Sequence, residues 1–255
     1  MKLRELYATY RRFTIFHFFH YLMKNKLKKI QAIFSGIALD IGCGEKPYLH
    51  CFKNLSAYWG TNSMIYYKHQ IVDKFTNCYI NDGTYLPFKA ESIDNLFCFQ
   101  VLPVFKDITI FLNEVNRILK KNGYLLLTTD FLYPIWNPPN NFWRTTNFGL
   151  QYLMDQTSFK VLSIEPFGGF WIMLARVFDS YYSSLLSIFL NNVKHEKRYI
   201  VKIYHFLKFV LFLFIGVPLQ PIIVNFLFVI CLILDKLAYN SNYTTNYLVL
   251  AQKRN

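Results

Sequence analysis

Residues 37–44 read Ile-Ala-Leu-Asp-Ile-Gly-Cys-Gly, the pattern of a buried strand that runs directly into a glycine turn. Gly42 and Gly44 let the backbone of such a turn approach a ligand where a Cβ atom would collide with it. The carboxylate of Asp40, just before the turn, can receive an ammonium group directly or through water. We therefore expect a ligand site at the carboxyl end of this first strand.

The ligand that suits this turn is a cation that carries both an adenosine and an amino acid. S-adenosylmethionine has these features, because its sulfonium joins an adenosyl group to a methionine. An Asp-x-Gly-x-Gly sequence alone is a weak signal, so the rest of the chain has to support the assignment.

Short apolar runs alternate with helical segments after Gly36, which is typical of an α/β fold. Strands are expected at residues 37–41, 57–61, 78–80, 93–99, 124–129, 160–165 and 246–251. This alternation predicts a Rossmann-like, doubly wound, seven-stranded and mostly parallel sheet. In such sheets the ligand crevice opens at the carboxyl ends of the strands, where residues 40–44 lie.

The clearest helix lies between the fourth and fifth strands, where Asp107 can cap its first turn. Its apolar stripe consists of Ile108, Phe111, Leu112, Val115, Ile118 and Leu119. Lys120-Lys121 would meet the negative end of the helix dipole, and Asn122-Gly123 would end the helix in a left-handed conformation. Further helices are expected from Pro47 onward and over residues 146–156.

Four parts are expected along the chain of 255 residues. They are N-terminal basic and aromatic helices at 1–35, a core domain at 36–165, a hydrophobic helical insertion at 166–240, and the last strand with its tail at 241–255. The insertion thus precedes a strand that has to return to the same sheet.

The net charge of +13 is concentrated at residues 1–29 and 194–208, beside apolar segments. Basic clusters in that setting favour contacts with lipid headgroups over nucleic acid, with simple solvated faces as the alternative. The five cysteines show no metal-ligand spacing and read as free thiols of a reducing compartment. No signal peptide is recognised, because no small-residue cleavage site follows residues 13–23. These features predict a cytoplasmic protein, peripheral to the inner face of the membrane.

The most apolar stretch, residues 206–234, contains Pro218 and Pro221, which are expected to divide it into two arms. Each arm is shorter than the hydrocarbon core of about 30 Å. A single crossing would also separate the last strand from its sheet. A helical hairpin in or on the cytoplasmic leaflet is therefore expected, with a hydrophobic cap on the domain or in a dimer interface as the alternative.

Several motifs in order resemble class I S-adenosylmethionine-dependent methyltransferases, most closely the "type 11" group often found with bacterial surface-polysaccharide and lipid modification. They are the first strand with its turn, Tyr85-Leu86-Pro87-Phe88, Ser92-Ile93-Asp94, Val101-Leu102, Leu112–Gly123, and Asn141-Phe142-Trp143-Arg144-Thr145-Thr146. The resemblance covers residues 36–169 and the last strand. It implies methyl transfer from S-adenosylmethionine to a small-molecule, saccharide or lipid-linked acceptor.

The resemblance also implies roles for single residues around the cofactor. Asp40, Gly42 and Gly44 would form the methionine end of the site, and Gln100 would line the crevice near it. Asn62 stands where an acidic residue usually grips the ribose hydroxyls, and Asp82 matches the position that meets the adenine amino group. The family's Val-Leu-Glu-His reads Val101-Leu102-Pro103-Val104 here, and Asn141 stands where an Asp is usual.

Methyl transfer depends mainly on positioning, because the sulfonium leaves without an acid. A hydroxyl acceptor gains from a general base, for which Asp130 is the first candidate and Tyr133 and His50 are weaker ones. Loop capping and ordinary packing are the alternatives for these three residues.

The connection after the fifth strand carries Trp136, Trp143 and Arg144, which suit a sugar face or an anionic group. Packing of the next helix is the alternative role for them.

No metal site is expected, and the oligomeric state stays open. Two other functions remain: a catalytically weak or silent membrane-associated protein of the same fold, and an NAD-dependent enzyme. The second lacks both the third glycine of its turn and an acidic residue after the second strand.

Overall fold

The computed structural model describes residues 17–63, 75–80, 83–181 and 217–254 of the chain. It separates into two compact units. The core unit comprises His20–Phe167 and Thr244–Asn255, and the helical unit comprises Met1–Phe19 and Gly168–Tyr243.

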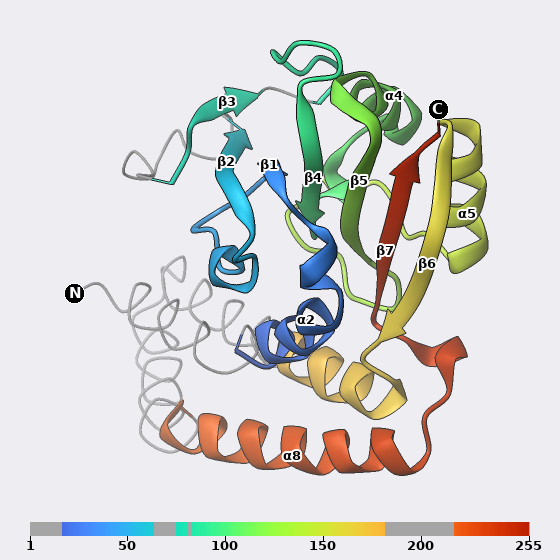
Figure 1. The fold of residues 1–255 in the computed structure, drawn as a ribbon. Coiled ribbons are helices and arrows are strands. Elements are labelled where there is room, and N and C mark those ends of the chain that lie inside the picture. Colours follow the sequence, from blue (N-terminus) through green and yellow to red (C-terminus); the bar gives the residue numbers. More distant parts are fainter. Residues whose placement is uncertain (1–16, 64–74, 81–82, 182–216, 255) are drawn as a thin grey trace, which may run out of the picture. The chain divides into compact units, whose positions relative to one another are not determined.

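The core unit is built on one seven-stranded sheet with the strand order β3-β2-β1-β4-β5-β7-β6 (Figure 1). Its strands are β1 (Gly36–Ile41), β2 (Leu55–Ser63), β3 (Cys78–Ile80), β4 (Ile93–Phe99), β5 (Leu119–Asp130), β6 (Phe159–Phe167) and β7 (Asn246–Lys253). The first five strands pair in parallel, and β7 lies antiparallel between β5 and β6. The expected Rossmann-like sheet is confirmed.

The described helices are α2 (His17–Ile30), α4 (Ile108–Ile118), α5 (Asn147–Gln156) and α8 (Val217–Leu237). Asp107 caps α4 as expected, since its Oδ1 accepts from the backbone N–H of Ile110 at 3.0 Å. Thr146 caps α5 in the same way through the N–H of Gly149 at 3.1 Å. The whole predicted apolar stripe of α4 is buried in the core with the leucines of β4 and β5.

Two local expectations were wrong. No α-helix begins at Pro47; the chain forms only the 3₁₀ turn η3 (Leu49–Cys51), because β2 already begins at Leu55 and leaves too few residues for a helix. Helix α4 ends at Ile118, so Lys120 lies in β5, where it pairs with Asp94 at 2.7 Å rather than with the helix dipole. Asn122 has the expected left-handed conformation, with a φ of 60°.

The helical unit contains two described helices, residues 170–181 and α8. Pro218 and Pro221 lie within the described part of α8, which continues to Leu237. Residues 222–234, which were expected to form the second of the two arms, are therefore part of a longer helix. The expected first arm and residues 182–216 lie outside the described residues. No helix in the described part is long and apolar enough to cross a membrane.

Buried Asp235 joins the two helices of this unit. Its carboxylate accepts from the backbone N–H groups of Gly169 and Trp171, both at 2.9 Å, and of Ile172 at 3.3 Å. The end of α8 thus caps the start of helix 170–181, and the two helices run antiparallel. A carboxylate at a helix N-terminus is stabilised by the free N–H groups and the helix dipole.

Candidate cofactor and acceptor site

The turn after β1 needs glycine at two positions for different reasons. Gly42 has a φ of 70°, and a Cβ atom there would lie 2.5 Å from Cγ2 of Val101. Gly44 has a φ of 51°, but a Cβ atom there would meet open space. The backbone of Gly42 is therefore packed against the protein, whereas the turn at Gly44 leaves room beside the backbone. This arrangement fits a ligand that lies against the turn.

Asp40 is the last residue but one of β1, and its carboxyl group is buried, with an exposed fraction of 1%. Its Oδ2 accepts a hydrogen bond from the hydroxyl of Tyr58 at 2.7 Å, and its Oδ1 has no hydrogen-bond partner among the described residues. Burial raises the pKa of Asp40 to about 7, partly offset by the Tyr58 hydrogen bond and the charge of Lys46. A buried carboxylate with one unused oxygen fits an ammonium group as ligand.

Asn62 lies beside the same turn but is engaged within the protein. Its Oδ1 accepts from the backbone N–H of Gly44 at 3.0 Å, and its Nδ2 donates to Oγ1 of Thr76 at 2.7 Å. Holding a ribose would require Asn62 to exchange these bonds. Asp82, the expected adenine contact, lies outside the described residues.

Gln100 follows β4 with a φ of 62° and links three strand ends. Its Nε2 donates to Oγ1 of Thr128 at 3.0 Å, and its Oε1 accepts from Nδ2 of Asn246 at 3.1 Å. The same Nδ2 donates to Oδ1 of Asp130 at 2.8 Å. A polar network therefore crosses the carboxyl ends of β4 and β5, on the side of the sheet where the glycine turn lies.

The structure brings Asp130 and Trp136 together. Oδ2 of Asp130 accepts from Nε1 of Trp136 at 2.5 Å, so both oxygens of this buried carboxylate are engaged. Tyr133 lies on the same connection, and its carbonyl accepts from Nε of Arg144 at 3.3 Å. His50 is exposed on η3.

The connection after β5 is held in place by its own polar side chains. The guanidinium of Arg144 donates to the carbonyls of Tyr133 and Pro134 and, at 2.7 Å, to Oδ1 of Asn141. Nε1 of Trp143 donates to the carbonyl of Phe105 at 2.9 Å, which ties the connection to the segment after β4. Arg144 therefore supports the loop, while the ring of Trp143 stays 43% exposed.

Two residues of the site, Tyr58 and Asn246, were missed by sequence reasoning. In the strand register Asp40 lies opposite Gly60, and Tyr58 precedes Gly60 by two residues on the same face of β2. Gly60 offers no side chain, so the hydroxyl of Tyr58 reaches the carboxylate. Asn246 pairs with Asp130 across the antiparallel β5–β7 register. A correct register would have revealed both contacts.

We expect the Tyr58→Phe variant to bind S-adenosylhomocysteine, the demethylated form of the expected cofactor, with a pH midpoint shifted upward by about one unit. The reason is that the lost hydrogen bond stabilises the charged form of Asp40. Calorimetric titrations across the neutral pH range would measure the midpoint, with exposed Tyr152→Phe as the matched control. An unchanged midpoint in Tyr58→Phe would contradict this role.

The comparisons with known proteins agree with the fold and the turn. Residues 39–127 match the family model described as a methyltransferase domain. No curated protein is significantly similar in sequence.

Among solved structures, the [4+2]-cyclase SpnF is 15% identical with a TM-score of 0.52, and the match covers 90% of this chain and 80% of that chain. A SAM-dependent methyltransferase from Archaeoglobus fulgidus is 12% identical with a TM-score of 0.50, covering 92% and 94%. A chain of the complex between the Haloferax volcanii Trm112 methyltransferase activator and a methyltransferase is 16% identical with a TM-score of 0.43. That match covers 52% of this chain and 65% of that chain, less than two thirds of its length.

The structural likenesses, at these identities, show the fold alone, and a cyclase among them illustrates that one fold serves several reactions. The sheet order and the turn define a Rossmann-like α/β protein. The family match is more specific, since it includes the end of β1 and the glycine turn. Residues 39–127 therefore match a methyltransferase domain, and this match supports S-adenosylmethionine as the cofactor.

Proposed function

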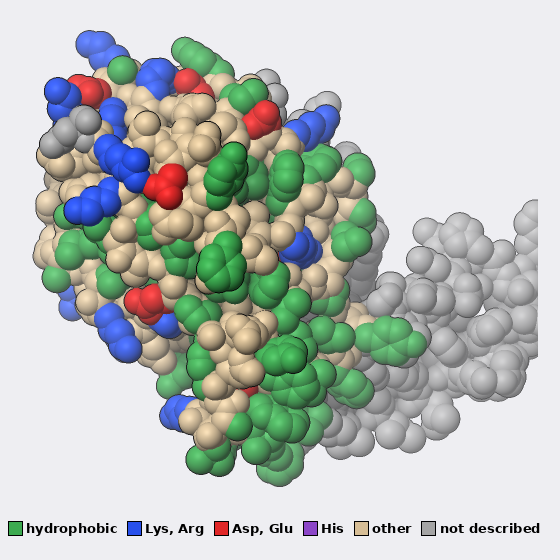
Figure 2. Space-filling model, turned by 90° about the vertical axis from the view of Figure 1, so that its right-hand side faces the viewer, with side chains coloured by type: hydrophobic (Ala, Val, Ile, Leu, Met, Phe, Trp, Pro, Cys, Tyr) green, Lys and Arg blue, Asp and Glu red, His purple; other side chains and the backbone are tan. Residues whose placement is uncertain are grey.

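We propose that this protein is an S-adenosylmethionine-dependent methyltransferase that acts at the cytoplasmic surface of a membrane, on a saccharide, small-molecule or lipid-linked acceptor. The observation that carries the proposal is the apolar surface of the helical unit. Phe226, Ile233 and Leu237 of α8 are 65%, 53% and 78% exposed. Figure 2 shows apolar side chains gathered on this unit. Exposed apolar surface of this extent is typical of a site that contacts a membrane or another protein.

The charge of the insertion supports a membrane as the contacted surface. Residues 166–240 contain seven lysines and arginines against three acidic residues. Two of the acidic residues, Asp179 and Asp235, are buried in the described structure. An apolar face with an excess of positive charge is complementary to the anionic headgroups of a cytoplasmic leaflet. We therefore assign the insertion to membrane docking and residues 36–165 with the last strand to catalysis.

Different residues of the chain would contact different parts of the cofactor. We propose that Oδ1 of Asp40 holds the ammonium group of the cofactor, and that the open turn at Gly44 receives the adjoining part. Bound S-adenosylmethionine supplies a methyl group on a sulfonium, which needs no acid to leave. Gln100 limits the crevice at the end of β4, and its position is fixed by Thr128 and Asn246.

The acceptor side of the proposed site is formed by aromatic rings on a fixed loop. Asp130 holds the ring of Trp136 through the indole N–H, and Trp143 is anchored through its own. Because both oxygens of Asp130 accept hydrogen bonds, we propose that it positions Trp136. Asp130 would have to give up one of these two hydrogen bonds before it could accept a proton from an acceptor hydroxyl. Fixed aromatic faces suit the apolar face of a sugar or a ring, and such positioning is the main requirement of in-line methyl transfer.

Binding to lipid vesicles tests the membrane assignment. The triple variant Phe226→Gln, Ile233→Gln, Leu237→Gln is expected to lower affinity for phosphatidylglycerol-containing vesicles on the order of 100-fold, since each side chain transfers about half its apolar surface. The matched control changes three exposed residues of the core unit, Ile110, Phe148 and Tyr152, to Gln. Co-sedimentation gives the affinities. Equal losses in both variants, or no binding of the wild-type protein, would contradict the proposal.

A further inference from the structure

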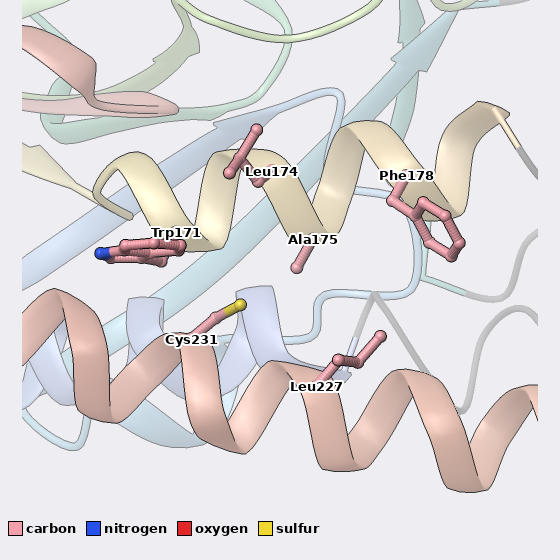
Figure 3. A pocket seen from close by; sticks show the side chains of 6 residues that line it. All are labelled: Trp171, Leu174, Ala175, Phe178, Leu227 and Cys231. Carbon is pink, nitrogen blue, oxygen red and sulfur yellow. The ribbon is translucent and has the colours of Figure 1, made fainter.

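The two helices of the helical unit line a half-open apolar pocket of about 230 Å³. It is lined by Trp171, Leu174, Ala175, Phe178, Leu227 and Cys231. Figure 3 shows Ala175 and Phe178 pointing from helix 170–181 toward α8, while Leu227 and Cys231 point back from α8. None of the lining side chains carries a charge.

The pocket is a defined feature of this unit because Asp235 fixes the spacing of its walls. The carboxylate binds the first N–H groups of helix 170–181, one turn along α8 from Cys231. Ile172 and Phe228, next in sequence to pocket-lining residues, are buried, with exposed fractions of 4% and 3%. The pocket therefore lies between helices that the carboxylate of Asp235 joins.

The lining chemistry restricts what the pocket can bind. An apolar cavity of roughly 150 Å³ stays dry and accepts a benzene molecule, so a larger one has room for a longer apolar group. Only Trp171 and Cys231 bring a heteroatom to the wall, so a sugar or a phosphate would lose its hydrogen bonds there. A hydrocarbon chain would lose none and gain about 0.8 kcal/mol for each buried CH₂ group.

The surroundings of the pocket favour a chain that belongs to a lipid. Phe178 and Leu227 line the pocket and are also 57% and 39% exposed, so the pocket is continuous with the apolar surface of the unit. Lys236 is exposed five residues beyond Cys231, near the end of α8, and both acidic residues of the described helices are buried. An anionic headgroup at the surface of these helices would therefore meet a lysine and no exposed carboxylate.

We propose that this pocket binds one hydrocarbon chain of an anionic lipid, and that the acceptor of the methyltransferase is lipid-linked. The second half of this proposal rests on the proposed function, whereas chain binding does not. An acyl chain and a polyisoprenyl chain share the chemistry that the pocket recognises.

Protection of Cys231 from alkylation tests the pocket directly in the full-length protein. Cys231 and Cys78 are the partly exposed thiols among the described cysteines, and Cys78 lies in β3 of the core unit. Burial, with the charge of Asp235, raises the pKa of the Cys231 thiol, so labelling with N-ethylmaleimide is run at about pH 8.5. Peptide mass spectrometry then follows each thiol separately.

We expect 1-decanol, as an acyl-chain probe, or farnesol, as an isoprenoid probe, to slow labelling of Cys231 by at least about fivefold and to leave Cys78 unchanged. Protection by one probe alone identifies the chain type. Ala175→Trp fills the pocket and is expected to abolish protection, whereas Val177→Trp, on the same helix but outside the pocket, retains it. Leu227→Gln provides a second pocket variant at a half-exposed position that tolerates a polar side chain.

Several outcomes would overturn the chain-binding proposal. They are a Cys231 thiol that does not react in the ligand-free protein, equal protection of both thiols, and protection that survives in both pocket variants. Binding of S-adenosylhomocysteine, measured in the same samples, reports on the proposed function independently. Chain binding without cofactor binding would leave the pocket assigned and remove the link to a methyl acceptor.

Discussion

Asp40→Asn is expected to weaken binding of S-adenosylhomocysteine about 10- to 150-fold at pH 8, because a charge-assisted hydrogen bond to a buried carboxylate is lost. The wild-type affinity should itself fall below about pH 7, where Asp40 takes up a proton, by up to about tenfold per pH unit. The variant should show no such dependence in this range. Calorimetric titrations between pH 5.5 and 8.5 provide both results.

Asp40 is also expected to make the folding stability of the ligand-free protein depend on pH. The folded pKa of Asp40, about 7, lies above the ordinary value of 3.8. The carboxylic acid form therefore contributes stability that is fully present below about pH 4 and is lost as the pH rises to about 7. The loss amounts to at most about 4 kcal/mol by linkage. Asp40→Asn should remove this decline, which denaturant unfolding across the same pH range would measure.

Glu91→Gln is the matched control for both measurements. It removes one negative charge from an exposed position before β4, at the opposite end of the strand from the turn. The account is contradicted if Asp40→Asn binds the ligand with wild-type affinity and pH dependence. It is also contradicted if Glu91→Gln reproduces the loss, since the effect would then come from net charge.

Asp235→Ala is expected to destabilise the helical unit by about 3 to 5 kcal/mol, the range for removing one partner of a buried charged network. The three N–H groups of Gly169, Trp171 and Ile172 would lose their acceptor while their surroundings stay apolar. Hydrogen exchange should show faster exchange over residues 169–181 and unchanged protection in β4 and β5. The reason is that the core sheet has its own buried cluster.

A second variant separates the role of the hydrogen bonds from that of the charge. Asp235→Asn keeps one acceptor oxygen at the same place. It should therefore lower the stability of the helical unit roughly half as much as Asp235→Ala does. Asp155→Asn, at an exposed residue of α5, is the control for charge. Uniform loss of protection throughout the protein in Asp235→Ala would show that the carboxylate is not a local clamp.

The sequence was sufficient for the sheet because local patterns specify its strands. The bounds of β3 and β4 were predicted to the residue, and β7 was predicted with its first residue, because turn residues and apolar runs delimit them. The connection after Gly44 was not predictable in the same way. Pro47 suits the first turn of a helix and therefore favoured a helix locally, but β2 begins too early to leave room for one.

The site was predictable only in part, since its polar contacts join residues far apart in the chain. Asp40 and the two glycines are adjacent in sequence, so their chemistry could be inferred together. By contrast, the partners of Asp130 come from Trp136 and Asn246, the latter through an antiparallel register that sequence alone does not fix. Arg144 looked like a ligand contact, yet its donors are used within the loop.

The central claim is that the turn after β1 binds an adenosyl cofactor. A titration of the wild-type protein tests this claim most directly. Isothermal calorimetry at pH 8 with S-adenosylmethionine is expected to show one site of micromolar affinity, and NAD should give no binding. A folded protein that releases no heat with S-adenosylmethionine at millimolar concentration would contradict the claim.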